Sequence, residues 1–360
     1  MKNKLILTLL LFVSIIHAQE QKQSYSFSLQ QAIEHALKNN YSIINADRDI
    51  EAAKKKKWET TTIGLPHIEG NVNYLNNFKI QQNQFTVNGQ TNTLEFGNYN
   101  SMDASFKLSQ LIFDGSYLVG LQSARTYLKI SENAKVKTNQ EIREIVINSY
   151  GNVLLADESI GILEKNKTIL EKTVFETQQT YNNGLIEEEN VEQFQITLAS
   201  VKSSLENVKR QKKIALNMLK LVLGIELEEQ LTLTDNLNSL AQTNVDLAIL
   251  KEEFKVENNI DYQIGKNVEE SNRLLLKLEK SKALPSLGAS VNFGSNTFGS
   301  RFTMFNGDQR WYNYSNLGIG LNVPIFSSLG RSARTQQAKI ALEQSKTELK
   351  ETEQKLKLQF

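Results

Sequence analysis

Two periods of apolar spacing alternate along the chain. In the segments 29–37 and 43–58, apolar residues recur three or four positions apart, which is the period of a helix. Ser28 followed by Gln31 matches a capping box, so we expect the first helix to begin at this point. The second helix should end at Gly64-Leu65-Pro66, because proline cannot continue a helix.

Beyond this proline the period becomes two. Apolar and polar residues alternate in four stretches, at about 67–76, 101–111, 286–295 and 312–323, and each stretch predicts a strand with one apolar and one polar face. The residues between the first two strands, about 76–99, are rich in Asn, Gln and Thr. We expect them to form a polar loop.

A proline-free segment from about residue 116 to 181 keeps the helical period throughout. At 1.5 Å per residue such a helix would be roughly 100 Å long, far more than a globular core needs. Tyr181-Asn182-Asn183-Gly184 predicts a turn, and a second helix should return from there to residue 223. An irregular connection, 224–245, follows.

The order of these features then starts again. We therefore predict an internal duplication, with a first repeat at 19–245 and a second at 246–360. The second copy ends in the middle of its long helix, which begins at about residue 330, so we expect the 360 residues to be a fragment that lacks a second helical hairpin. The matching features are Asn39-Asn40 with Asn258-Asn259, Leu65-Pro66 with Leu284-Pro285, Ile112-Phe113 with Ile325-Phe326, and Ser-Ala-Arg-Thr at 123–126 and 332–335.

Residues 1–18 have the features of a secretory signal peptide, with Lys2 and Lys4 before an apolar run and Ala18 at its end. The chain has no cysteine. Disulfides, thiol catalysis and a lipid-modified N-terminal cysteine are therefore excluded. We expect an exported protein whose mature N-terminus carries no lipid.

Charge and motifs argue against nucleic acid and against catalysis. The chain has 41 basic and 40 acidic residues, so it lacks the positive charge that nucleic-acid binding needs. Outside the signal, the only histidines are His35 and His67, and no nucleophile or phosphate-binding motif is present. We predict no catalytic residue, no cofactor and no metal site.

The alternating strands are long enough to cross an outer membrane at a tilt. A sheet in lipid must close on itself, and the smallest single-chain outer-membrane barrels have eight strands. Four strands therefore require several copies of the chain to share one barrel. The long helices carry narrow apolar stripes that also need neighbours. The competing interpretation is a soluble sheet that packs one face on a core.

The chain resembles the TolC family of outer-membrane efflux proteins over essentially all of its mature length. The motifs that carry the resemblance are Ser28-Leu29 with Ala32, Ala36-Leu37 and Asn39-Asn40, Leu65-Pro66, Leu111-Ile112-Phe113-Asp114-Gly115, Tyr181 with Gly184-Leu185-Ile186, Val191 and Phe194, and Val323-Pro324-Ile325-Phe326. One departure is Ser327-Ser328, where the family usually has an acidic or polar residue and glycines.

The resemblance implies a mainly helical TolC-like fold. Long antiparallel helical hairpins would form a periplasmic α-barrel, and four transmembrane strands per chain would contribute to a shared twelve-stranded barrel in a homotrimer. It also implies a passive exit duct in the outer membrane of a Gram-negative bacterium. The partners would be a periplasmic adaptor and an inner-membrane transporter, in a tripartite efflux or type I secretion system. No enzymatic activity is expected.

Three groups of site residues follow from these expectations. Gly184, Leu185 and Ile186 at the hairpin tip would contact the adaptor, although they could equally be a plain helix–turn–helix cap. Asp103 and Lys107 would face the lumen. The residues expected to face outer-membrane lipid are Phe106, Leu108, Phe293, Ile319 and Leu321.

A different class of function is a soluble periplasmic coiled-coil adaptor or structural protein. An adaptor should carry one helical hairpin inserted in a small β-domain. This chain instead predicts two pairs of strands and the beginnings of two hairpins.

Overall fold

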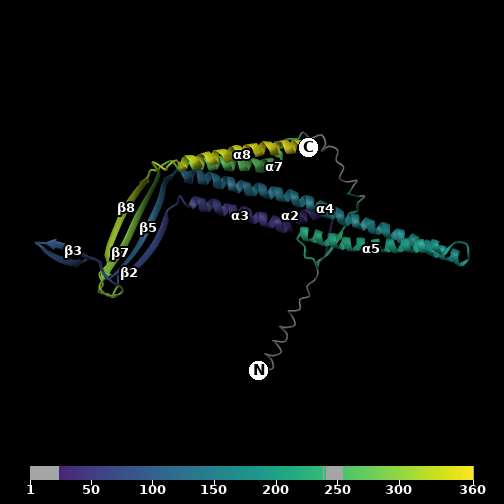
Figure 1. Cartoon of the computed structure of the whole chain (residues 1–360), viewed down its shortest axis with the longest axis horizontal. Coiled ribbons are helices and arrows are strands. Elements are labelled where there is room, and N and C mark those ends of the chain that lie inside the picture. Colours follow the sequence, from purple (N-terminus) through teal and green to yellow (C-terminus); the bar gives the residue numbers. More distant parts are fainter. Residues whose placement is uncertain (1–23, 238, 241–253, 360) are drawn as a thin grey trace, which may run out of the picture. The chain divides into compact units, whose positions relative to one another are not determined.

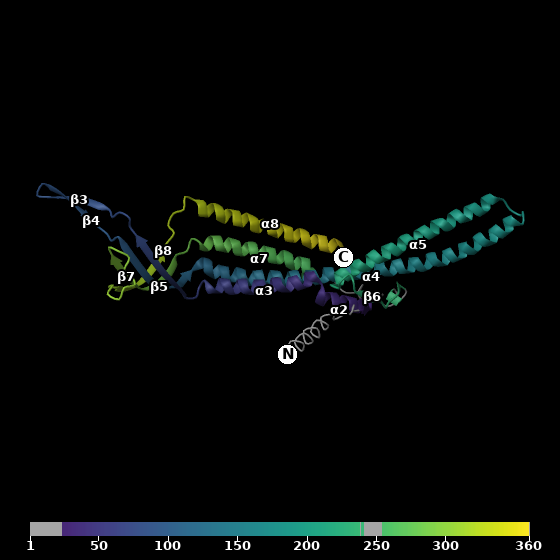
Figure 2. The same ribbon diagram turned by 90° about the horizontal axis from the view of Figure 1, so that it is seen from below.

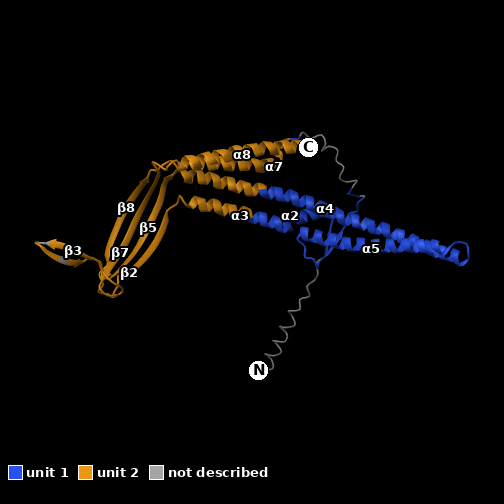
Figure 3. Cartoon of the chain, in the orientation of Figure 1, with its two compact units in different colours: residues 1–48, 134–254 blue, residues 49–133, 255–360 orange. Residues whose placement is uncertain are grey.

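The computed structural model describes residues 24–237, 239–240 and 254–359. The expected signal peptide lies outside the described residues. So do residues 238 and 241–245 of the expected connection at 224–245. The chain forms two compact units (Figure 3), residues 1–48 with 134–254, and residues 49–133 with 255–360. Helices α3 (Tyr41–Thr62) and α4 (Gly115–Asn182) contribute residues to both units.

The first unit has a helical core. Helix α2 (Leu29–Asn39) begins with the expected capping box, in which the Gln31 amide donates to the Ser28 hydroxyl and the Ser28 amide to the Gln31 side chain. One face of α2 is buried against α4 and against α5 (Glu188–Leu223). The fully buried side chains of this core include Val146, Tyr150, Leu219 and Leu223.

Asparagine ends α2 and begins α3. The Asn40 side chain accepts a hydrogen bond of 2.8 Å from the Ser42 amide and donates one of 2.7 Å to the Val222 carbonyl. In the second unit Asn259 accepts from the Asp261 amide at 2.8 Å, at the start of α7 (Ile260–Ser281). The same local device therefore begins a helix in each predicted repeat.

Helices α4 and α5 form an antiparallel hairpin between residues 134 and 223 (Figure 2). Three ion pairs join them, Lys202–Glu171 at 3.0 Å, Lys209–Glu164 at 3.7 Å and Lys212–Asp157. Exposed pairs of this kind each contribute about 1 kcal/mol or less, so they favour the pairing of the helices rather than hold it alone.

Tyr150 joins the helical core to a small parallel sheet. Strands β1 (Ser24–Phe27) and β6 (Gln230–Leu233) pair in parallel, and the Tyr150 hydroxyl donates to the Phe27 carbonyl at 3.0 Å. The same oxygen lies 3.2 Å from the Asp235 carboxylate, which accepts from the Leu29 amide at 2.7 Å. Burial raises the pKa of the Tyr150 phenol to about 12.

The second unit contains a four-stranded antiparallel sheet in the order β2, β5, β7, β8 (Figure 1). These strands, at His67–Asn76, Asn100–Asp114, Ser286–Gly299 and Tyr312–Asn322, lie where the alternating stretches predict them. Strand β5 is longer than expected and contains a bulge between Leu111 and Phe113. The expected loop at 76–99 is wrong in part, because β3 (Gln82–Val87) and β4 (Gln90–Glu95) form a hairpin within it.

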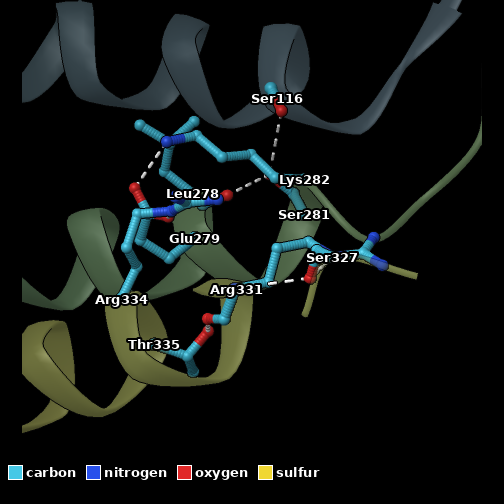
Figure 4. Close-up of polar contacts among 9 residues, drawn as sticks. All are labelled: Ser116, Leu278, Glu279, Ser281, Lys282, Ser327, Arg331, Arg334 and Thr335. Atoms are coloured by element: carbon cyan, nitrogen blue, oxygen red, sulfur yellow. Dashed lines mark hydrogen bonds and ion pairs between the residues drawn. The ribbon is translucent and has the colours of Figure 1, made fainter. Parts of the chain in front are cut away.

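Helices α7 and α8 (Gly330–Gln359) pack side by side and extend from one end of the sheet (Figures 1 and 2). Glu279 in α7 is largely buried and pairs with Lys282 at 2.5 Å and with Arg334 at 3.5 Å (Figure 4). Arg334 belongs to the second Ser-Ala-Arg-Thr motif. A buried carboxylate left without these cations would be costly, which gives this arginine a local structural role.

Candidate functional site: a two-faced sheet and a helical tip

The four-stranded sheet has one apolar and one polar face. Residues paired across antiparallel strands point to the same face, so the register shows on which face of the sheet each side chain lies. Phe106 pairs with Gly70 on one side and Phe293 on the other, and Leu108 pairs with Ile68 and Val291. One alternating set across all four strands is therefore predominantly apolar.

All five residues expected to face lipid lie on this apolar face. Phe106 and Leu108 share it with Phe293, and the β7–β8 register adds Ile319 and Leu321, opposite Ala289 and Leu287. Their side chains are exposed in the chain, with Ile319 at 69%. An apolar face of this extent on a sheet indicates that something other than water covers it.

Aromatic residues gather at the end of this face that lies away from the helices. The ring of Phe302, in the loop between β7 and β8, meets Tyr74 of β2 edge to face at 5.2 Å. Phe305 packs on Phe302 at 6.0 Å, and Met304 between them is buried. Aromatic residues at the ends of strands are typical of outer-membrane sheets, and this cluster has that composition and lies at one end of the sheet.

The opposite face is polar. Asp103 accepts a hydrogen bond of 2.9 Å from the Tyr314 hydroxyl, and Asn292 donates one of 2.8 Å to Asn316. Lys107 lies in the register between Glu69 and Asn292. The two residues expected to face the lumen, Asp103 and Lys107, therefore share the polar face.

The tip of the α4–α5 hairpin is a glycine-terminated turn. Gly184 has a φ of 75°, and its amide donates to the Tyr181 carbonyl while the Leu185 amide donates to Thr180. This pair of bonds is the Schellman motif, which uses a left-handed residue to end a helix. Leu185 is 74% exposed, whereas Ile186 is half-buried. The expected tip residues thus lie together, and Leu185 is the apolar side chain that the tip presents.

Two other kinds of site are absent from the described part of the chain. There, no three side chains of His, Asp or Glu gather in a way that could hold a metal ion. Nor does any described helix combine the length and the apolar character that a membrane crossing requires.

Comparison with known proteins decides the family. A model of the family described as outer membrane efflux protein matches residues 32–225, more than half of the chain. The chain belongs to the outer membrane efflux protein family. No curated protein sequence matches it at a significant level.

Solved structures share the fold of this efflux protein. CusC, whose conformational changes accompany folding and transmembrane channel formation, has a TM-score of 0.69 at 19% identity, and the match covers 94% of this chain and 76% of CusC. The outer membrane protein VceC of Vibrio cholerae gives 0.66 at 16% identity, with 91% and 75% covered. The CmeC outer membrane channel of Campylobacter jejuni gives 0.65 at 18%, with 90% and 67% covered. Family and fold are those of channel proteins rather than enzymes.

The sequence pattern did not predict several residues that contribute to these surfaces. Phe302 and Phe305 lie in a loop whose pattern shows no period, so no rule of spacing could assign them to the apolar face. The β3–β4 hairpin did carry a signal. Asn88-Gly89 occupies its turn with both φ angles positive, and Asn-Gly between polar strands favours such a hairpin.

Proposed function

We propose that this efflux protein is the passive outer-membrane exit duct of a tripartite efflux or type I secretion system. Three copies would share a twelve-stranded β-barrel, four strands from each, above an α-barrel of helical hairpins in the periplasm. Small molecules or proteins would leave through the lumen. Energy and selectivity would come from an inner-membrane transporter, joined to the duct by a periplasmic adaptor.

The observation that carries this proposal is the sheet. One face is apolar and exposed, the other is polar, and the edge strands β2 and β8 are exposed along their whole length. Lipid offers no hydrogen-bond partner to a strand edge, so a sheet exposed to it must close. This sheet has four strands, an even number, which lets copies join edge to edge and keep the antiparallel alternation all the way round.

The polar face would then line the lumen, with Asp103 and Lys107 in contact with water and cargo. The apolar face would meet lipid through Phe106, Leu108, Phe293, Ile319 and Leu321. Burial of such a face in lipid follows the same transfer free energy as burial in a protein core.

The adaptor would dock at Gly184, Leu185 and Ile186. The leucine is exposed at the end of a hairpin that its own backbone turn holds, so contact with a partner would remove its apolar surface from water. Glu188 and Glu189, in the first turn of α5, are explained as charges favourable at a helix N-terminus.

Fractionation and conductance test the duct. The full-length protein should partition with the outer membrane, and its detergent-purified form should give ion conductance in planar bilayers. Recovery from the soluble periplasm without detergent, with no conductance, would favour the soluble adaptor instead.

A tip variant tests the docking site separately. Leu185→Arg should keep outer-membrane location and conductance but lose cross-linking to the adaptor in cells. Leu227→Arg, an exposed leucine away from the tip, is the matched control and should retain that cross-linking. Equal cross-linking in both variants would remove the tip from the proposal.

A further inference from the structure

A pocket lies where the sheet of the second unit meets its helices. Strand β5 continues directly into α4 at Gly115, and α7 leads through Leu284 into β7. Residues at both junctions line a cavity of about 420 Å³. The other residues around it come from the first two turns of α4 and the last two turns of α7, so the cavity lies at the helical end of the sheet (Figure 1).

The wall of this pocket is mainly apolar. Phe113, Leu118 and Leu284 line it and are each about half exposed, while Val119 beside them is buried. A Cβ atom at Gly115 would lie only 2.7 Å from the side chain of Leu284. The glycine therefore lets this leucine lie over the start of α4 and close one side of the pocket.

The pocket continues the apolar face of the sheet. Phe113 pairs with Leu287 of β7, and Leu287 pairs with Leu321 of β8. Leu321 is one of the residues proposed to meet lipid. Because paired residues point to the same face, Phe113 belongs both to the proposed lipid-facing surface and to the pocket.

Two lysines of α7 give the pocket a positive charge. Lys277 and Lys280 line it, and both are exposed. The ammonium of Lys277 donates a hydrogen bond of 2.8 Å to the side-chain oxygen of Gln122, another pocket residue, which holds the charge beside the cavity. Among the described residues, no Asp or Glu lines the pocket.

The nearest acids of α7 are already bound by other cations. Glu279 pairs with Lys282 at 2.5 Å and with Arg334 at 3.5 Å. Glu270 accepts two hydrogen bonds of 2.6 Å from the guanidinium of Arg273. The charge of the two pocket lysines is therefore available to an anion that enters the pocket.

We infer that this pocket binds an anionic phospholipid. Its headgroup phosphate contacts Lys277 and Lys280, and part of one acyl chain lies against Phe113 and Leu118. A basic group beside an apolar cavity, at the border of a lipid-facing surface, has the chemistry that such a lipid requires. The inference rests on the proposed function, which places the helical end of the sheet at the periplasmic leaflet, and adds a specific lipid site to it.

Native mass spectrometry of the detergent-purified full-length protein tests the site. The probes are palmitoyl-oleoyl phosphatidylglycerol, which is anionic, and the phosphatidylcholine with the same chains, which has no net charge. We expect one tightly held phosphatidylglycerol per chain and weaker binding of phosphatidylcholine. The double variant Lys277→Gln with Lys280→Gln should bind phosphatidylglycerol roughly 10- to 30-fold more weakly, as expected when two lysines near an anionic lipid are lost.

The matched control removes two exposed lysines from the other end of α7. Lys255 precedes this helix, and Lys266 lies roughly 20 Å from Lys280 along it. Lys255→Gln with Lys266→Gln should keep the affinity of the wild type. If the two double variants bind phosphatidylglycerol equally well, the pocket lysines only complement the negative end of the helix dipole, and the inference is wrong.

Leu118→Gln tests the apolar wall. It puts an amide where the acyl chain would lie, so it should weaken the binding of both lipids; unchanged binding of both would overturn the inference. The proposed function fails in a different experiment. Recovery of the unmodified full-length protein from the soluble periplasm, without conductance, would overturn the duct, whereas a conducting outer-membrane protein that does not prefer phosphatidylglycerol would overturn only the lipid site.

Discussion

The hydroxyl of Tyr314 in β8 donates a hydrogen bond of 2.9 Å to Asp103 in β5, although β7 lies between these strands. Gly294 of β7 permits the contact. It pairs with Tyr314, and a Cβ atom built on it would lie only 2.4 Å from the tyrosine ring. The ring therefore lies across the glycine. Its hydrogen bond joins β8 to β5 over the intervening strand β7, on the polar face of the sheet.

Gly294→Ala should displace this ring and break the bond to Asp103. The ring is exposed and can swing away from the new methyl group, so we expect only a modest decrease in the midpoint for thermal loss of the β signal in circular dichroism. Gly320→Ala is the control, because the space around a Cβ at Gly320 is empty to 4 Å. If both variants unfold at the same temperature, the ring does not depend on the glycine.

Tyr150 should make the stability of the first unit sensitive to alkaline pH. Its pKa is about 12 in the folded protein and 10.0 in an unperturbed tyrosine. The neutral phenol is therefore favoured by folding. Its contribution to the free energy of unfolding is complete below pH 10 and is lost as the pH rises from 10 towards 12.

The control for this pH dependence is Tyr150→Phe. Other tyrosines and lysines titrate in the same range, so the quantity to measure is the difference between the wild type and this variant in urea midpoint across pH 8 to 12. The variant should be less stable at pH 8, by about 1–3 kcal/mol, because the hydroxyl's partners stay buried. The difference should shrink above pH 10. A constant difference would contradict the raised pKa.

Neighbouring residues in β7 test the two faces of the sheet. Phe293→Arg puts a charge on the face proposed to meet lipid, where an arginine at the bilayer midplane costs about 2–4 kcal/mol. Asn292→Arg puts the same charge on the polar face, next to the amide of Asn316. We expect Phe293→Arg to lower the amount of protein in the outer membrane and Asn292→Arg to leave it nearly unchanged. Equal losses would contradict the assignment of the faces.

Local chemistry explains why much of this fold could be predicted from sequence. A capping box at Ser28, a glycine at position 224 and an alternating strand each act over a few residues, and α2, α5 and β7 begin or end where those signals lie. Alternation also placed Phe106 and Asp103 on opposite faces, because the side-chain period of a strand is two.

Contacts between distant segments explain what could not be predicted. Strands β1 and β6 are four residues each and pair across some two hundred positions, so neither has a pattern long enough to recognise. The place of Phe302 beside Tyr74 depends on how a loop folds back. The Tyr150–Asp235 contact likewise depends on the position of β6 next to α4, and local sequence signals do not predict that position.

Two glycines with the same backbone conformation should differ in their tolerance of a side chain. Gly184 and Gly224 both end long helices, with φ angles of 75° and 72°. A Cβ at Gly184 would meet open space, whereas one at Gly224 would lie 2.3 Å from the carbonyl oxygen of Asn39. Gly184→Ala should therefore cost only the strain of a left-handed alanine, about 1–2 kcal/mol.

Gly224→Ala carries that strain and a backbone clash that no side-chain rotation can relieve. Because Asn39 and Gly224 hold the ends of α2 and α5 together, the clash should separate these helices and disrupt the contact of Asn40 with Val222. We expect Gly224→Ala to lower the urea midpoint of the first unit clearly more than Gly184→Ala does, as measured by helical circular dichroism. Equal midpoints would mean that the approach of Asn39 to Gly224 is not needed for the packing of this core.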